Sequence, residues 1–339
     1  MRFSTGRVAL VVGLALAAWA VAPGPAASQA VTQCAPAIPL FTDWSAPVNL
    51  GPPVNTENLE SCVTISKNRL SLFFSSNRQS PGTGDRDLYV SKRHRTTDPW
   101  GEPEPLTALN TGVWESCPAL SLDEHRLYFT SPRTAGGCGG QDIWVSRRHN
   151  RRDDFGWEPP VNLGCEAEGG PNSASVDLMP ALFEDEAGRV LMYFVSGRSE
   201  GNWDLYQSEM RDDDSFGPAT PVAELNGPDV EMGPTVRRDG LEVIFLSYRP
   251  GGSEDWYDFW TATRTSTRDP WSAPVHVPSL GSPSWANGKI SLSFDGRELY
   301  FAAWPDGEES WDIWVARREK LHGKKHRPVD PRGMMTPDR

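Results

Sequence analysis

Acidic side chains recur at one position of a repeated sequence pattern, each at the start of a short, mostly apolar segment. The segments align on Pro118, Pro180 and Pro234. The residues at this position are Glu60, Glu115, Asp177 and Glu231, with Asn287 in the fifth copy. If the segments surround one narrow channel, the carboxylates repel one another unless a cation or hydrogen-bond donors compensate. This position is therefore a candidate ligand-binding site at the mouth of a channel.

Three kinds of site fit such a ring of carboxylates. In the first, each carboxylate caps backbone amides or pairs with an arginine of a neighbouring repeat. The second is a Ca²⁺ site, since this hard cation favours several oxygen ligands. The third is a glycoside hydrolase, which needs an acid and a nucleophile or base beside the bond. The structural arrangement is favoured, because features present in every repeat usually belong to the architecture. Symmetric carboxylates also fit poorly with chemistry that needs two distinct environments.

Arginine and aspartate bracket one loop of each repeat. We expect them to form ion pairs that hold the loop, with the alternative that the arginines bind an anionic ligand. The arginines are Arg78, Arg133, Arg198 and Arg249, and the aspartates are Asp87, Asp142, Asp204, Asp258 and Asp312. The fifth repeat has Pro305 in the arginine position.

The long loops contain aromatic residues, namely Trp114, Trp203, Trp256, Tyr257, Trp285 and Trp304. Aromatic rings stack on sugar faces while carboxylates accept hydroxyl protons, so together they indicate a carbohydrate surface. Most of these rings are expected to pack between repeats. Trp114, Trp285 and Trp304 fall outside the repeated aromatic positions, and we assign these three to ligand binding.

The five cysteines all lie in the first half of the chain. The loop pair Cys138–Cys165 is the favoured disulfide. Cys62 and Cys117 occupy equivalent places in adjacent repeats, where the required Cα spacing is expected to be exceeded. No Cys-x-x-Cys or histidine spacing indicates a metal site.

The elements that position these residues are short β-strands in five repeats. The second strand of each repeat ends at a phenylalanine, and these are Phe74, Phe129, Phe194, Phe245 and Phe301, at spacings of 55, 65, 51 and 56 residues. A third strand begins at each repeated aspartate, and an aromatic residue stands two positions later in each copy. This alternation is typical of a half-buried strand. Self-similarity at this period is typical of propellers and related repeat folds.

A fourth strand is marked by an aromatic residue followed by proline, as in 157–163, and it is missing after Asp312. The matching segment, 44–50, stands at the other end of the chain and shares Pro-Val-Asn-Leu with 157–163. An open solenoid would need capping repeats instead. The sequence therefore predicts an all-β fold, a five-bladed β-propeller of four-stranded blades whose N-terminal strand closes the last blade.

The repeat resembles the WD40-like (PD40) repeat of TolB-like propeller proteins. The most faithful copy is Leu127-Tyr128-Phe129-Thr130-Ser131 followed by Asp142-Ile143-Trp144. The resemblance covers roughly 44–316 and implies a propeller in an exported protein. It implies little about activity, because propellers host enzymes, lectins and docking platforms alike.

The chain ends differ from the repeats. Arg2 and Arg7 precede an apolar stretch and a small-x-small site at Ala30, so 1–30 is read as a signal peptide. We expect a linker over 31–40, the propeller over 41–318 and a disordered basic tail over 319–339, with no membrane span in the mature chain. The tail is read as the only basic cluster, and a net charge of −12 argues against nucleic-acid binding.

These observations predict an exported, monomeric binding or scaffolding propeller of the periplasm or cell surface. Its expected ligand is a protein or a carbohydrate bound on the channel face. The alternative is a carbohydrate-active hydrolase that uses the channel-mouth carboxylates. No catalytic residue and no cofactor are assigned, and Ca²⁺ is the one cation considered.

Overall fold

Each repeat supplies three strand-forming segments of five to eight residues, and turns separate them. The computed structural model describes residues 41–78, 86–199, 202–252, 257–281, 286–304 and 310–321, without the side chains of 286 and 287. Aromatic and β-branched residues in these segments favour extended backbone, and antiparallel pairing satisfies their amide groups.

The strands form five antiparallel sheets of four strands each. Blade one is β2 (Glu60–Ile65), β3 (Ser71–Ser76), β4 (Asp87–Lys92) and β5 (Glu104–Pro105). Blade two is β6 (Ser116–Leu120), β7 (Arg126–Ser131), β8 (Asp142–Arg147) and β9 (Val161–Asn162). Blade three is β10 (Asp177–Glu184), β11 (Val190–Ser196), β12 (Asp204–Glu209) and β13 (Thr220–Pro221). Blade four is β14 (Glu231–Val236), β15 (Glu242–Ser247), β16 (Asp258–Thr263) and β17 (Val275–His276). Blade five is β18 (Ala286–Leu292), β19 (Glu298–Ala303), β20 (Asp312–Arg317) and β1 (Val48–Asn49). Two short 3₁₀ helices, η1 (Glu166–Glu168) and η2 (Pro278–Leu280), lie in connecting loops.

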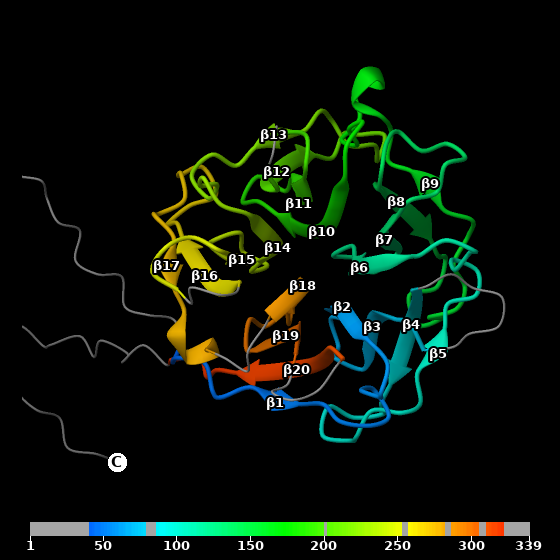
Figure 1. Ribbon diagram of the computed structural model, residues 1–339, viewed down its shortest axis with the longest axis vertical. Helices are drawn as coiled ribbons and strands as arrows, with labels where there is room; N and C mark the ends of the chain where they lie inside the picture. Colours follow the sequence, from blue (N-terminus) through cyan, green and yellow to red (C-terminus); the bar gives the residue numbers. More distant parts are fainter. Residues whose placement is uncertain are drawn as a thin grey trace, which may run out of the picture. The chain divides into compact units, whose positions relative to one another are not determined.

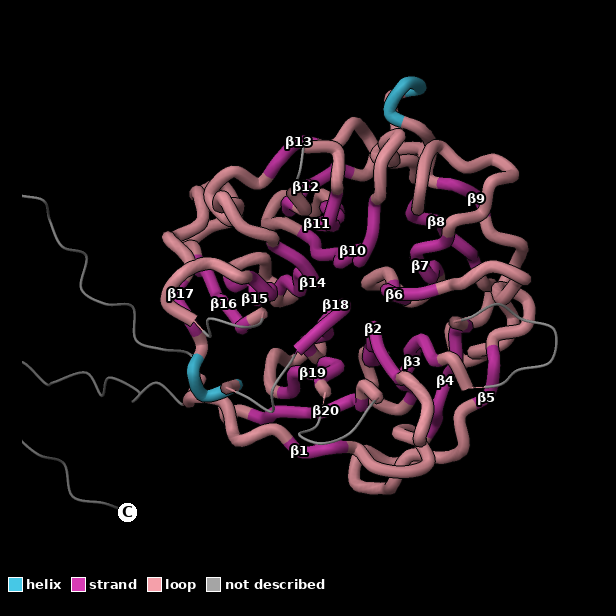
Figure 2. The backbone as a smooth tube through the Cα atoms, viewed as in Figure 1, coloured by secondary structure: helices cyan, strands magenta, loops and turns pink. Residues whose placement is uncertain are grey.

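The five sheets stand around one axis, which confirms the predicted five-bladed β-propeller. The first strand of each blade is innermost, and β2, β6, β10, β14 and β18 surround the centre (Figure 1). The two-residue fourth strands lie at the outer rim, where they alternate with long loops (Figure 2). Buried aromatic residues such as Phe73, Phe129 and Phe301 fill the space between the sheets.

Every innermost strand contains a bulge, because its pairing register with the second strand shifts. Inside each bulge lies one residue with a left-handed backbone conformation, namely Cys62, Cys117, Met179, Gly233 and Gly288. At Gly233 a Cβ atom would come within 2.4 Å of the Gly288 carbonyl oxygen, so this position requires glycine. Bulges bend a strand and re-aim its side chains, and here they bring the five blades together at the axis.

The closing strand pairs as the sequence predicts. Val48 of β1 lies opposite Val315 of β20, and the Ser45 amide donates to the Arg317 carbonyl at 2.7 Å. The guanidinium of Arg318 lies 4.3 Å from the ring of Trp44. Arg93 and Trp100, Arg148 and Trp157, and Arg264 and Trp271 form the same contact inside blades one, two and four. The segment from the start of the chain therefore replaces an ordinary fourth strand.

Pairing continues past 318, the expected end of the propeller. Phe41 forms a bridge with Lys320, and the Thr42 amide donates to the Glu319 carbonyl. The expected signal peptide and linker, and most of the expected tail, lie outside the described residues. The part of the chain that the structure covers contains no helix long and apolar enough to cross a membrane.

Candidate functional site

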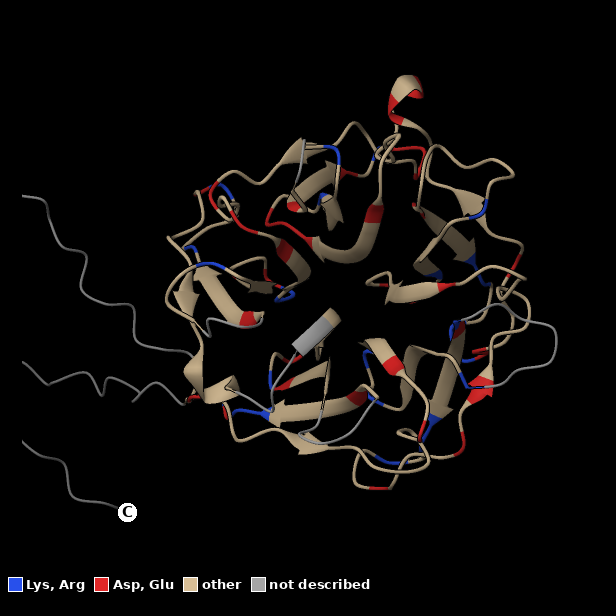
Figure 3. Ribbon diagram, in the orientation of Figure 1, with Lys and Arg blue, Asp and Glu red and all other residues tan. Residues whose placement is uncertain are grey.

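The four repeated carboxylates begin or directly precede the innermost strands, where Figure 3 shows acidic segments at β2, β6, β10 and β14. Glu60, Glu115, Asp177 and Glu231 are all completely buried. In each, one oxygen accepts a hydrogen bond from the amide four residues earlier, for example Thr56 to Glu60 at 2.9 Å and Thr111 to Glu115 at 2.8 Å. They do not line the axial cavity, so the expectation that they ring the channel mouth was wrong.

The arginine of each loop pairs with the first-strand carboxylate of its own blade. The ion pairs are Arg78–Glu60 at 2.9 Å, Arg133–Glu115 at 3.0 Å, Arg198–Asp177 at 2.8 Å and Arg249–Glu231 at 2.9 Å. Each guanidinium also lies over two rings of its blade, as Arg249 does at 4.9 Å from Phe245 and 5.4 Å from Trp260. The expected pairing of these arginines with Asp87, Asp142, Asp204 and Asp258 is therefore corrected.

Asp142 and Asp312, two of the third-strand aspartates, turn toward the fourth strand instead. Asp142 accepts hydrogen bonds from the Cys138 amide at 2.6 Å and from Asn162 of β9 at 3.0 Å. Asp312 accepts one from Asn49 of β1 at 2.6 Å. The asparagine of each Pro-Val-Asn-Leu segment therefore fastens the outer strand, and in blade five this contact is part of ring closure.

A repeated asparagine was not predicted from the sequence. Asn55, Asn110, Asn172 and Asn226 each stand five residues before a repeated carboxylate. Each side chain bonds both backbone groups of one residue in the preceding blade, as Asn110 does with the Leu88 amide at 2.9 Å and carbonyl at 3.0 Å. The Asn-x₄-Glu/Asp spacing was a detectable signal, and these bonds join blade five to one, one to two, two to three and three to four.

Blade five lacks this whole set of groups. The pairing register places Ala286 opposite Ala303, as Glu60 is opposite Ser76. Asn287 pairs with Ala302 and so stands one place further on, which corrects the alignment that gave it the carboxylate position. Gly281 stands five residues before Ala286. Carboxylate, serine, arginine and asparagine are thus lost together.

The axial cavity, of about 350 Å³, is bounded by residues of all five innermost strands, including Ser61, Ser116, Leu178, Met232 and Gly288. Around it stand the residues that immediately precede the third-strand aspartates. They are Arg86, Gln141, Trp203, Tyr257 and Trp311, one from each blade. Trp114 adds a further ring. A repeated frame therefore presents a different side chain from each blade to one cavity.

The buried carboxylate positions hold these cavity residues in place. The amide of Glu60 donates to the Trp311 carbonyl at 2.8 Å, and that of Glu115 donates to the Arg86 carbonyl at 2.8 Å. Asp177 bonds Gln141 and Glu231 bonds Trp203 in the same way, at 2.7 and 2.9 Å. The backbone amide at the carboxylate position of one blade thus holds the cavity residue of the preceding blade. The carboxylate itself holds the segment that leads into its own strand.

The cavity combines flat apolar rings with one cation. Burial lowers the pKa of the Arg86 guanidinium, and no hydrogen bond or ion pair of this side chain occurs within the described residues. Among the described residues, neither aspartate nor glutamate lines the cavity. Such a site can stack on a flat ligand and neutralise an anionic group of it, whereas a two-carboxylate hydrolysis needs acids facing the bond.

The predicted ligand-binding aromatics are only partly brought together. Trp114 lines the cavity, while the half-buried Trp304 does not. Trp285 and Trp256 lie outside the described residues. Trp203 and Tyr257, which were expected to pack between blades, line the cavity, and Trp311 was not singled out at all.

Two disulfides join cysteines of the described part of the chain. Cys138 is bonded to Cys165 with a Cα–Cα distance of 5.3 Å. Cys62 is bonded to Cys117 across 4.4 Å, so the spacing argument against this pair was wrong. Both residues occupy the bulge position, with φ of 49° and 55°. The bulges bring the adjacent strands close at the axis, and the bridge lines the cavity.

The Ca²⁺ hypothesis required carboxylates that converge. Each of the four instead faces the arginine of its own blade. Within the described residues, no group of three or more histidine, cysteine, aspartate or glutamate side chains is arranged to hold a metal ion.

No family model and no curated protein matches the sequence. Among solved structures, the chain is similar to the α-L-arabinofuranosidase PaAbf62A from Podospora anserina, at a TM-score of 0.53 and 12% identity over 84% of this chain and 98% of that one. The catalytic domain of the Coprinopsis cinerea GH62 α-L-arabinofuranosidase gives 0.53 and 14% over 83% and 98%. TolB from Acinetobacter baumannii gives 0.45 and 14% over 75% of this chain and 54% of TolB, so the chain spans about half the length of TolB. At these identities, similarity shows the five-bladed β-propeller fold alone.

Proposed function

We propose that this protein is an exported binding propeller that recognises a glycan or protein ligand in the axial cavity. The observation that carries the proposal is the set of five cavity residues, one from each blade, that differ while the surrounding frame repeats. Architecture explains repeated residues, whereas variation confined to one cavity on that architecture is typical of a binding site. Arg86 and the rings favour a ligand with a flat face and an anionic group.

Hydrolysis is the weaker candidate. The four first-strand carboxylates considered for it are buried and bonded to arginine, and they do not line the cavity. The similarity to arabinofuranosidases lies in the fold, and a fold does not determine activity.

Export and family assignment complete the proposal. The charged and apolar start of the sequence and two disulfides support a periplasmic or cell-surface location. We assign the repeats to the WD40-like (PD40) type of TolB-like propellers, and we propose that the protein acts as a monomer.

The test is a fluorescence titration, because three tryptophans line the cavity among the described residues. Purified protein is titrated with neutral oligosaccharides, acidic oligosaccharides and short peptides. We expect one class to change the tryptophan emission, and Trp311→Ala to weaken its binding roughly two- to tenfold through lost stacking. Arg86→Gln should weaken it only if the ligand is anionic. The matched control is Arg268→Gln, an arginine with 77% of its side chain exposed in blade four.

Two results would contradict this proposal. One is sustained release of sugar from an arabinofuranoside or glycan by the wild-type protein. The other is binding that Trp311→Ala leaves unchanged.

A further inference from the structure

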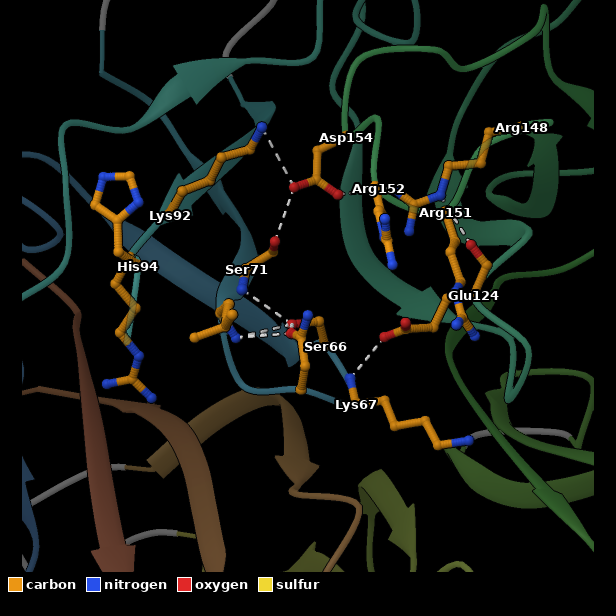
Figure 4. Close-up of a pocket in the computed structure, with 13 residues that line it drawn as sticks. Ser66, Lys67, Ser71, Lys92, His94, Glu124, Arg148, Arg151, Arg152 and Asp154 are labelled. Atoms are coloured by element: carbon orange, nitrogen blue, oxygen red, sulfur yellow. Dashed lines mark hydrogen bonds and ion pairs between the residues drawn. The ribbon is translucent and has the colours of Figure 1, made fainter. Parts of the chain in front are cut away.

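A second cavity, of about 750 Å³, lies between blades one and two (Figure 4). It is bounded by the β2–β3 turn and by the loops that follow β4 and β8. Strand β2 starts beside the axial cavity and ends at this groove, so the two sites lie on opposite faces of the ring. We call this cavity the basic groove. A ligand bound in it would not touch the axial cavity, so its binding does not depend on the proposed function.

The basic groove is electropositive although the chain carries a net charge of −12. Six cationic residues line it, namely Lys67, Lys92, Arg93, Arg148, Arg151 and Arg152. Two acidic residues, Glu124 and Asp154, oppose them, so the net charge of the lining is 6 − 2 = +4 with histidine neutral. His94 adds a ring with hydrogen-bonding nitrogens.

Both acidic residues are already engaged. Asp154 accepts bonds from buried Arg148 at 2.7 Å and from Ser71 at 2.8 Å, and the Glu124 carboxylate accepts the Lys67 amide at 2.6 Å (Figure 4). Asp154 is thus balanced by Arg148 and by Lys92 at 3.5 Å, while Glu124 keeps its charge, which the net value of the lining includes.

Two exposed cations remain for a ligand. Arg151 and Arg152 form no ion pair with any described residue, and both are exposed, whereas the ammonium of Lys67 lies 4.2 Å from the ring of Phe294. Arg93 and Arg148, by contrast, are held over Trp100 and Trp157 at 4.1 and 4.4 Å and bond backbone carbonyls. The groove thus combines fixed cations with cations that have no counter-charge in the described part of the chain.

Part of this charge is not a product of the repeat. Arg93 and Arg148 have counterparts in Arg264 and Arg318, which lie over tryptophan in the same way, but Arg151 and Arg152 do not belong to that repeated contact. At the turn position where blades two, four and five have Asp123, Asp239 and Asp295, blade one has Asn68. The loop after the third strand reads Lys-Arg-His-Arg over 92–95 in blade one and Arg-Arg-His-Asn-Arg-Arg over 147–152 in blade two, whereas 212–214 in blade three is Asp-Asp-Asp. The expectation that the tail holds the only basic cluster was therefore wrong, and the cations that the other blades do not repeat need a reason beyond architecture.

We propose that the basic groove binds an acidic polysaccharide through its carboxylate or sulfate groups. Arginine recognises such planar or tetrahedral oxyanions with paired hydrogen bonds. No phenylalanine, tyrosine or tryptophan is among the described residues that line the groove, which disfavours single-stranded nucleic acid bound by base stacking. A DNA duplex carries one negative charge per about 1.7 Å, far more densely than one charge per sugar, so the negative charge of the chain outside the groove opposes a duplex more strongly than an acidic polysaccharide.

The test uses the full chain and a fluorescein-labelled oligogalacturonate, titrated at low and at high salt. We expect binding that salt weakens, and about tenfold weaker binding by Arg151→Gln/Arg152→Gln at low salt. Both side chains are exposed and unpaired among the described residues, so the variant should fold normally, which its melting temperature checks. The control is Arg268→Gln/Lys320→Gln, which removes the same charge elsewhere on the surface and should leave affinity unchanged.

The proposal is overturned if oligogalacturonate does not bind, or if both double variants bind like the wild type. It is also overturned if single-stranded DNA of equal charge binds more tightly than the oligogalacturonate. Trp311→Ala should not alter this binding, so failure here is distinguishable from failure of the axial-cavity proposal.

Discussion

At the scale of single residues, the buried carboxylate at the start of the first strand is present together with its arginine or not at all. Blades one to four have a carboxylate, its arginine and the bonds that satisfy both. Blade five has Ala286 and Ala303 in the corresponding register. A buried charge without its partner costs several kcal/mol, whereas exchanging the whole set for apolar groups can be neutral.

Blade two offers a direct test of this rule. Arg133→Ala should lower the free energy of unfolding by about 3–5 kcal/mol, because it leaves Glu115 buried without its counter-charge. The triple variant Glu115→Ala/Ser131→Ala/Arg133→Ala removes the carboxylate and its partners together, as in blade five, and should regain much of that loss. Urea unfolding monitored by tryptophan emission measures both. A triple variant less stable than Arg133→Ala would show that the set does not act as a unit.

Lys289 is a buried cation in the channel without a carboxylate bonded to it among the described residues. It is 3% exposed, and its ammonium donates to the Val63 carbonyl at 3.4 Å. It lines a cavity of about 90 Å³ together with Lys67, Glu124 and Arg238. Burial lowers the pKa of Lys289 from 10.5 to about 7.

Lys289 therefore makes stability depend on pH. Between about pH 7 and 10.5 the unfolded chain holds a proton that the folded chain lacks, so the free energy of unfolding rises with pH in this window. The slope is at most about 1.4 kcal/mol per pH unit. Lys289→Met should be more stable than the wild type at about pH 7, and this advantage should shrink toward pH 9. Melting temperatures of both proteins across that range measure the effect, and curves that run parallel would refute the assignment.

At the scale of elements, the closing strand does more than its two paired residues suggest. Trp44 is 8% exposed and lies against Arg318, and Arg318 in turn bonds Glu242 of blade four at 2.7 Å through both terminal nitrogens. The segment 41–50 thus links blade five to blade four as well as completing its sheet.

Deleting 41–50 should therefore destabilise the ring strongly. The loss should exceed the 3–5 kcal/mol that is typical for removing one buried tryptophan, because strand pairing is lost as well. Truncation after Leu321 removes none of the described contacts and should change stability by less than about 0.5 kcal/mol. Thermal melting of the two truncated proteins compares them. Equal melting temperatures would contradict closure by the N-terminal strand.

At the scale of the whole molecule, the sequence predicts the architecture better than the site. The five blades are predictable because the phenylalanines from Phe74 to Phe301 recur at propeller spacing. Closure is predictable because the segment that begins at Trp44 matches the fourth strand that the last repeat lacks. The same alignment drew attention to Glu60 and its equivalents, which are repeated because they hold strands. The cavity residues Arg86, Gln141 and Trp311 share a position but not a residue type, so a search for recurrence cannot find them.

The sequence also could not predict which of two similar groups an arginine or a cysteine pairs with, because that depends on the three-dimensional structure. Blade two contains two carboxylates, Glu115 and Asp142, with which Arg133 could pair. The directions in which these side chains point decide that Arg133 pairs with Glu115, and the sequence does not show these directions. The Cys62–Cys117 bridge depends in the same way on a left-handed bulge that the sequence does not announce.

The pairing of Val48 with Val315 joins two strands that are synthesised far apart in time. The ribosome makes Val48 early and its partner 315 − 48 = 267 residues later, an interval on the order of tens of seconds. Throughout that interval Trp44 has no Arg318 to lie against, and blade five lacks the strand that β1 pairs with. Strand β1 is therefore made first, but the ring can close only after β20 has also been made.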